Sequence, residues 1–269
     1  MAYTTINKST DNFTTTTWTG DSTTPKTFTT GTFKPDWLWG KNRSQAYAHQ
    51  LYDTTRGAGN DKEIVSNNNG AEGASNPETY GYVSAFTSTG FTATRGTDSA
   101  GDDYWNESPD NYVAWSWKAN GGTTSSNSDG SITSTVQANT TAGFSIVQYT
   151  GTGSGSNSTV GHGLGGVPEM MIVKDRDSTS DHWWVYHHHA NGTNSSDPET
   201  DYFVLSGSGA RADNAGPWND TKPTSTVFTI GANGWTNSAV NYIAYLFRSI
   251  DGFSKVSAYH ATGATNNSF

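Results

Sequence analysis

The sequence predicts an all-β fold with essentially no helix, arranged as two tandem β-sandwich modules of jelly-roll-like character. Three observations lead to this prediction. Short runs of β-branched and aromatic residues, separated by turn residues, recur along all 269 residues. No stretch of about ten residues or more sustains the 3.6-residue period of an amphipathic helix. Blocks of sequence also recur in the same order at a nearly constant spacing, which is typical of an internal duplication.

The repeat consists of three matched blocks. Each block of the first copy has a counterpart 130 to 133 residues later in the chain. Such regular spacing is hard to obtain by chance, so we interpret the halves as two copies of one structural unit. The matched blocks are PDWLWGKNR (35–43) with PEMMIVKDR (168–176), FTTTTWTG (13–20) with FSIVQYTG (144–151), and NYVAWSWK (111–118) with NYIAYLFR (241–248).

The repeat also sets the expected domain boundaries. We expect a first sandwich over residues 1–121 and a second over residues 142–269, joined by a Gly/Ser/Thr-rich linker with one short strand over residues 122–141. Residues 251–256 resemble the opening of the second copy, which indicates the first strand of a partial third repeat. We therefore expect residues 253–263 to pair with the second sandwich or with a neighbouring subunit.

Gly, Asn, Asp and Pro residues bound the strand-like runs. Two of these runs, 112–117 and 242–247, are apolar at both alternating positions, which predicts central strands with both faces covered. Trp37, Trp39 and the two tryptophans of 112–117 are expected in the core. The expected strands are 14–19, 37–39, 50–52, 82–86, 91–94 and 112–117 in the first copy, and 144–149, 170–174, 183–187, 202–205, 227–230 and 242–247 in the second.

The composition limits the classes of partner. Charged residues make up 14% of the chain and the net charge is −9, so the polarity comes mainly from Thr, Ser, Asn and Gly. A negative chain disfavours binding to nucleic acid and to anionic membranes, both of which need a basic surface. The lack of Cys excludes disulfides and thiolate metal sites. The N-terminus lacks the regions of a signal peptide, and no apolar run is long enough for membrane insertion.

Histidines are the sharpest candidates for a metal site. His187, His188 and His189 follow an aromatic run. On a strand, His187 and His189 would point the same way, about 6.5–7 Å apart. They could bind a divalent metal if a third ligand were present. The alternative is a strand end whose histidines hydrogen-bond within a loop or at a subunit interface.

Acidic loops are a second kind of candidate. Asp175 and Asp177 follow an expected strand, and residues 98–107 (DSAGDDYWNE) hold further carboxylates around Trp105. Such loops can supply oxygen ligands to Ca²⁺, but neither has the spacing of a calcium-binding loop, and Asp and Gly are ordinary turn residues. The carboxylates of residues 98–107 could catalyse glycoside hydrolysis only if two of them formed a pair at a defined separation. We assign no catalytic residue, metal or cofactor, with Ca²⁺ as the open alternative.

Tryptophans near loops are the candidates for ligand binding. Trp18, Trp105, Trp218 and Trp235 lie in or near expected loops. Exposed aromatic side chains can stack on sugars or provide the anchors of a protein interface. We favour a protein partner, because homotypic assembly is common for repeated β modules.

Several longer motifs resemble a known group of proteins. The motifs are MAYTTI, PDWLWGKNR, NYVAWSWKANGG, GSITSTVQANTTAGFSIVQYTGTG, HGLGGVPEMMIVKDRDS, DPETDYFVL and DGFSKVSAY. Together they are similar to structural proteins of marine bacteriophages, including cyanobacterial and pelagic ones, which carry tail-fibre-like modules singly or in tandem. The resemblance spans nearly the whole chain. It implies a virion component and brings no established catalytic or ligand-binding residue.

The sequence thus predicts a non-enzymatic virion structural protein, either a capsid decoration or a component of a tail or fibre. We expect synthesis in the host cytoplasm, homo-oligomeric assembly with a trimer as one option, and contacts with other virion proteins. A lectin-like, carbohydrate-binding receptor module that contacts host surface glycans is the alternative. A glycan depolymerase is a third hypothesis, disfavoured because two small copies leave little room for an extended substrate groove.

Overall fold

The computed structural model confirms the all-β class. It describes residues 5–98, 103–153, 155, 157–190, 197–232 and 234–259. The helical segments of these residues are single turns: η1 (Ser9–Asp11), α1 (Pro77–Tyr80), η2 (Pro198–Thr200) and α2 (Gly234–Asn237). None is long and apolar enough to cross a membrane. The strands are β1 (Phe13–Thr19), β2 (Lys26–Thr29), β3 (Trp37–Asn42), β4 (Gln50–Asp53), β5 (Ile64–Val65), β6 (Tyr82–Thr87), β7 (Gly90–Thr94), β8 (Asn111–Trp117), β9 (Ser125–Asn127), β10 (Ser134–Asn139), β11 (Phe144–Thr150), β12 (Ser158–Gly161), β13 (Met170–Asp175), β14 (Trp183–His187), β15 (Asp201–Val204), β16 (Ala212–Asp213), β17 (Val227–Ile230) and β18 (Asn241–Phe247).

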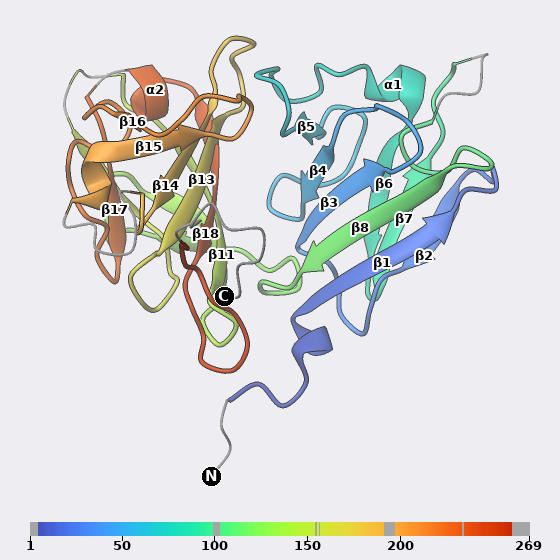
Figure 1. Cartoon of the computed structure of the whole chain (residues 1–269), viewed down its shortest axis with the longest axis horizontal. Coiled ribbons are helices and arrows are strands. Elements are labelled where there is room, and N and C mark those ends of the chain that lie inside the picture. Colours follow the sequence, from blue (N-terminus) through green and yellow to red (C-terminus); the bar gives the residue numbers. More distant parts are fainter. Residues whose placement is uncertain are drawn as a thin grey trace, which may run out of the picture.

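The strands form two modules that lie side by side (Figure 1). The first module has a large sheet of order β1-β8-β3-β4-β5 and a small sheet of order β2-β7-β6. The second has a large sheet of order β16-β15-β14-β13-β18-β11-β10-β9 and a small sheet of order β12-β17. Neighbouring strands in all four sheets are antiparallel.

Three hydrophobic clusters place these sheets in four layers. One cluster fills the first sandwich, between its small and large sheets, and includes Leu38 and Phe91. A second fills the other sandwich and includes Val147 and Phe228. The third lies between the two large sheets and takes residues from both modules, Trp37 among them. The layers therefore run small, large, large, small, and the two large sheets share a core.

The shared core explains why the central strands are apolar on both faces. In β3, Leu38 points into the first sandwich while its neighbour Trp37 points toward the second module, because side chains alternate along a strand. β18 follows the same rule, with Tyr242 in the second sandwich and Tyr245 in the shared core. The predicted central position of β8 and β18 is confirmed.

The matched sequence blocks occupy equivalent places in the two modules. β1, β8, β3 and β4 are neighbours in the same order as β11, β18, β13 and β14. Trp18 stacks on Tyr112 with ring centroids 5.4 Å apart, and Tyr149 stacks on Tyr242 at 5.0 Å. The hydroxyl groups of Tyr112 and Tyr242 each accept a backbone N–H from the turn before the strand.

The segment expected to be a linker is instead part of the second large sheet. It supplies β9 and β10, and β10 pairs with β11 from Thr135 to Asn139. Its polar composition suggested an exposed linker, but Gln137 is buried. The Nε2 atom of Gln137 donates to the hydroxyls of Thr54 and Thr55 at 3.0 and 2.8 Å, which satisfies the buried amide. The supposed linker therefore ties the second module to the first.

The C-terminal segment does not form the expected strand with the second sandwich. The described residues 253–259 make a single β-bridge, between Ile250 and Ser254. Val256 hydrogen-bonds through its N–H and its carbonyl oxygen to side chains of the second module. Residues 260–263 of the expected strand lie outside the described residues. Pairing with a neighbouring subunit stays a prediction.

Candidate functional site: an aromatic groove between the modules

A groove of about 520 Å³ opens where the two modules meet. Its floor is made by side chains at strand ends: Phe13 begins β1, Trp117 ends β8, Phe144 begins β11 and Phe247 ends β18. Antiparallel pairing brings them together, because Phe13 is opposite Trp117 and Phe144 is opposite Phe247. The two large sheets thus contribute equivalent aromatic pairs, one from each module.

The four rings are in contact with one another. The ring centroids of Phe13 and Trp117 are 4.9 Å apart, and those of Phe144 and Phe247 are 5.1 Å apart. Across the module boundary, Trp117 lies 6.4 Å from Phe247. The first two pairs are tilted and the third is edge-to-face, and each such pair contributes roughly 0.5–1.5 kcal/mol beyond simple burial. We call this feature the aromatic groove.

Three cations surround the aromatic groove. Lys118, Arg248 and Lys255 line it together with Ser9 and Asn12. None of the three forms an ion pair with a carboxylate of the described residues. An apolar floor beneath positive side chains can hold a ligand or a peptide with an apolar body and an anionic end.

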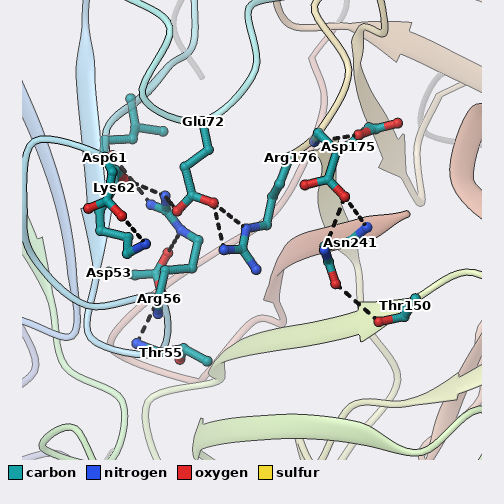
Figure 2. Close-up of polar contacts among 12 residues, drawn as sticks. Asp53, Thr55, Arg56, Asp61, Lys62, Glu72, Thr150, Asp175, Arg176 and Asn241 are labelled. Atoms are coloured by element: carbon teal, nitrogen blue, oxygen red, sulfur yellow. Dashed lines mark hydrogen bonds and ion pairs between the residues drawn. The ribbon is translucent and has the colours of Figure 1, made fainter. Parts of the chain in front are cut away.

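A buried ionic network fixes the two modules beside the shared core (Figure 2). The side chain of Arg56 has no exposed area and binds Asp53 at 2.5 Å and Glu72 at 3.1 Å. Glu72 reaches Arg176 of the second module at 2.5 Å, and the hydroxyl of Tyr245 donates to Asp53 at 2.7 Å. Each buried charge therefore has a partner of opposite sign. Removing one member of a pair would leave the other charge buried and uncompensated.

The predicted histidines lie in a turn and not along one strand face. β14 ends at His187, and the backbone N–H of His189 donates to His187 Nδ1 at 3.1 Å. Their ring centroids are 6.2 Å apart. Burial lowers the pKa of His187 and of His188, so both favour the neutral form. Among the described residues, no three His, Asp or Glu side chains gather closely enough to hold a metal ion.

The predicted acidic residues act as turn acceptors. Asp175 accepts the backbone N–H groups of Asp177 and Ser178 at 2.8 and 2.9 Å. Asp177 accepts the backbone and side-chain N–H groups of Asn241 at 2.9 and 3.0 Å. Hydrogen bonds from N–H groups of the protein thus account for both carboxylates. In the second acidic loop, residues 99–102 lie outside the described residues.

Two of the tryptophans predicted to bind ligands are buried. Trp105 and Trp218 are each 1% exposed, so the expectation of exposed loop aromatics is wrong for both. They belong to turns that fold over the sandwiches and insert the indole rings between the sheets. Trp235 is half-buried and stacks on Trp184, with ring centroids 4.4 Å apart and planes 4° apart. Trp18 is also half-buried.

The sequence reasoning missed the aromatic groove and the ionic network. Phe13, Phe144 and Phe247 were visible as members of the repeated blocks, but that reasoning treated those blocks as strands of separate sandwiches. An aromatic residue at the same strand end in both copies was the available signal. Arg56 and Glu72 lie outside the matched blocks, and nothing local in the sequence brings them to the second module.

The fold and the groove define a class: an all-β protein of two fused sandwiches with an aromatic groove at their joint. The chain belongs to a family described as a domain of unknown function, DUF7483, whose model matches residues 8–269. The match covers both modules, so the family unit is the pair and not the single sandwich. Comparison with curated proteins and with solved structures finds no match to the chain.

Proposed function

We propose that this chain is a non-enzymatic structural protein of a bacteriophage particle, acting as a capsid decoration or as part of a tail or fibre. It is made in the host cytoplasm and assembles with copies of itself and with other virion proteins. The resemblance to marine phage structural proteins supports this assignment. The observation that carries it is the core shared by the two large sheets, which makes one rigid body from two modules.

The shared core resists bending because it is densely aromatic. Trp37, at 1% exposure, stacks on Tyr245 with ring centroids 4.3 Å apart and lies 5.8 Å from Phe144. Moving one module relative to the other would separate these rings and expose apolar surface, at roughly 25 cal/mol per Å². A body that transmits force without hinging suits a mechanical or decorating role.

The self-assembly part of this proposal is tested in solution. The purified chain is measured by size-exclusion chromatography with light scattering over a hundredfold concentration range, roughly 1–100 µM, which spans moderate affinities. A discrete multiple of the 28.8 kDa chain mass is expected. A strictly monomeric chain at the highest concentration contradicts self-assembly.

The virion part is tested on particles. Mass spectrometry of density-purified particles of the encoding phage should detect the chain at a fixed stoichiometry to the major capsid protein, and image reconstruction should place it. Its absence from purified particles, together with its presence in the lysate, contradicts the proposal.

A second candidate function, carbohydrate recognition, is favoured by one observation. Trp235 and Tyr202, both half-buried, pack on Trp184, so several aromatic side chains gather at one place in the second module. Glycan-array binding that is lost in Trp235→Ala and kept in Trp115→Ala, a half-buried tryptophan of the first module, supports this function. A blank array with the folded chain counts against it.

A further inference from the structure

β1 is an open edge of the first large sheet. It pairs with β8 on one side, and no described strand pairs with its other side. The other edges of the large sheets are short, since β5 and β16 have two residues and β9 has three, whereas β1 has seven. The sequence of β1, FTTTTWT, has no charge and no proline, and its ladder has no bulge. It therefore lacks the usual protections of a sheet edge.

The ladder shows which backbone groups of β1 face outward. The carbonyl of Asn12 accepts the N–H of Lys118 at 2.9 Å, and the N–H of Gly20 donates to the carbonyl of Asp110 at 2.7 Å. Paired groups alternate along an antiparallel strand, so the even-numbered residues face β8. The N–H and C=O groups of residues 13, 15, 17 and 19 then point away from β8, toward the open edge.

The second module shows what this edge can accept. β11 holds the place of β1, and its outward groups are covered by β10 in an antiparallel ladder. In that ladder Thr135 is opposite Gln148, Gln137 is opposite Ile146 and Asn139 is opposite Phe144. The edge that β10 covers in the second module is open in the first.

The C-terminal segment, which resembles the start of β11 over residues 251–256, also resembles β10 over residues 254–258. Residues 254–258 (SKVSA) match residues 134–138 (STVQA) at three of five positions. Their burial alternates between half-buried and exposed, as in a strand with one apolar face, yet residues 255–258 belong to no strand. The molecule therefore holds a β10-like segment outside any sheet, as well as a β11-like strand with an open edge.

We propose that residues 254–258 of one copy add as an antiparallel strand to β1 of a second copy. The register carried over from β10 and β11 sets Lys255 opposite Thr17 and Ser257 opposite Thr15. The donor and acceptor surfaces differ, so the contact is head-to-tail and produces a ring or a fibre. This inference rests on the self-assembly in the proposed function and supplies its contact.

The way residues 254–258 are held in their own copy fits this role. The N–H of Val256 donates to the Ser249 hydroxyl at 3.0 Å, and its carbonyl accepts from His188 Nε2 at 3.1 Å. Both bonds are made by the edge of residues 254–258 that faces the second module of the same copy. In an extended segment the groups of residues 255 and 257 face the opposite way, which is the edge that the proposed ladder needs.

The geometry favours a second copy over pairing within one chain. In its own copy, Lys255 lines the aromatic groove together with Phe13, at the start of β1. The proposed register instead sets Lys255 beside Thr17, four residues and about 13 Å further along the strand. Pairing within one chain would require the segment to leave Ser249 and His188.

Cysteine cross-linking tests the contact, because the chain contains no Cys of its own. Two single variants, Thr15→Cys and Ser257→Cys, are mixed at equal concentration and oxidised mildly. Directly opposed residues in a hydrogen-bonded pair have Cα atoms about 5.5 Å apart, within the range that a disulfide spans. We expect a disulfide-linked dimer that joins one copy of each variant, identified by its linked peptide.

The matched control replaces Thr15→Cys by Thr19→Cys, which is exposed on the same strand but lies about 13 Å out of register. The control mixture should give at least about tenfold less linked dimer, because that separation exceeds disulfide reach. Equal yields from both mixtures would overturn the register and the proposed contact.

The outcomes separate this inference from the proposed function. A discrete oligomer by light scattering without the 15–257 link overturns the strand addition and leaves self-assembly standing. A strictly monomeric chain that gives no link overturns both. A double variant, Thr15→Cys with Ser257→Cys, that closes a disulfide within one chain while the mixed single variants give none shows pairing in the same copy and overturns the intermolecular contact.

Discussion

The two modules begin with equivalent strands whose surroundings differ. β11 lies inside its sheet and is buried at five of its seven residues, whereas no residue of β1 is fully buried. The sequences follow this difference, since Ile146 and Val147 stand where β1 has threonines. The comparison shows that two strands with equivalent backbone ladders carry different side chains, according to what covers each strand.

The loops after β3 and β13 keep the same hydrogen-bonding pattern in both modules, although the burial of their lysines differs. Lys41 and Lys174 both donate to backbone carbonyls of the loop that follows the strand. The next residue, Asn42 or Asp175, accepts two backbone N–H groups of that loop. Lys174 is fully buried and Lys41 is half-buried, so the same turn carries a larger desolvation cost in the second module.

The largest expected difference between the modules concerns two tryptophans, each seven residues before the equivalent Tyr112 and Tyr242. Trp105 packs in the first sandwich against Tyr52 and Phe91. Trp105→Ala should therefore lower the free energy of unfolding by about 3–5 kcal/mol. Trp235→Ala should lower it by roughly 1–3 kcal/mol, because its stacked pair with Trp184 and its edge-to-face pair with Tyr202 are lost. Urea denaturation measures both, and equal losses would contradict the difference in burial.

Proline substitution separates the open edge of β1 from the covered edge of β11. Gln148→Pro should cost about 3 kcal/mol or more, since the ladder assigns its N–H to β10. Thr17→Pro, at the equivalent position, removes an N–H that faces the open edge and should cost markedly less in folding. It should also weaken self-association by about tenfold or more if strand addition occurs there. Thermal unfolding and light scattering give the two readouts.

The buried Lys174 predicts a pH dependence of stability that is larger in the second module than in the first, where burial also lowers the pKa of Lys41. Burial lowers the pKa of Lys174 to about 8, although the nearby Asp175 and Asp181 carboxylates oppose the change. Between this pKa and the unfolded value of about 10.4 the unfolded chain binds more protons, so stability should rise with pH across that window. Lys174→Met should lose this rise relative to the native chain, while Lys41→Met should keep most of it. Denaturation between pH 7.5 and pH 10.5, set to span that window, measures the difference.

A buried carboxyl of the first module should produce the smallest effect. Burial raises the pKa of Glu63, with the neighbouring Ser75 acting in the opposite direction. Above the unfolded pKa of about 4.3 the folded state holds the proton longer, so stability falls as pH rises. Glu63→Gln should therefore be more stable than the native chain at pH 7 and nearly equal to it at pH 4. A gain of equal size at both pH values would show that desolvation is not its cause.

Sequence patterns predicted the strands well and their partners poorly. The twelve expected runs correspond to observed strands because β-branched and aromatic alternation is a local signal. β2 (KTFT) and β9 (SSN) were missed because short polar strands lack that alternation. The shared core was missed because Trp37 and Tyr245 each look like ordinary core residues of their own module. Which sheet covers such a side chain is a long-range property that strand patterns do not encode.

The residues of the candidate sites could likewise be predicted as residue types, but their surroundings could not. The histidine and aspartate candidates were recognisable as residue types, but their hydrogen bonds to nearby N–H groups depend on where β13 and β14 end. The burial of Trp105 and Trp218 depends on turns that fold back over a sheet. The aromatic groove needs strand ends from both modules, so the recurring sequence blocks, and not any single motif, were the feature that pointed to it.

The shared core also has a consequence for synthesis in the cell. Trp37 leaves the ribosome 208 residues before its stacking partner Tyr245. At typical translation rates of about 5–20 residues per second, the interval is roughly 10–40 s. Throughout that time the aromatic face of the first module has no second module to cover it. The nascent chain therefore exposes an aggregation-prone aromatic surface for most of its translation. A chaperone that shields aromatic surface should raise the yield of folded protein.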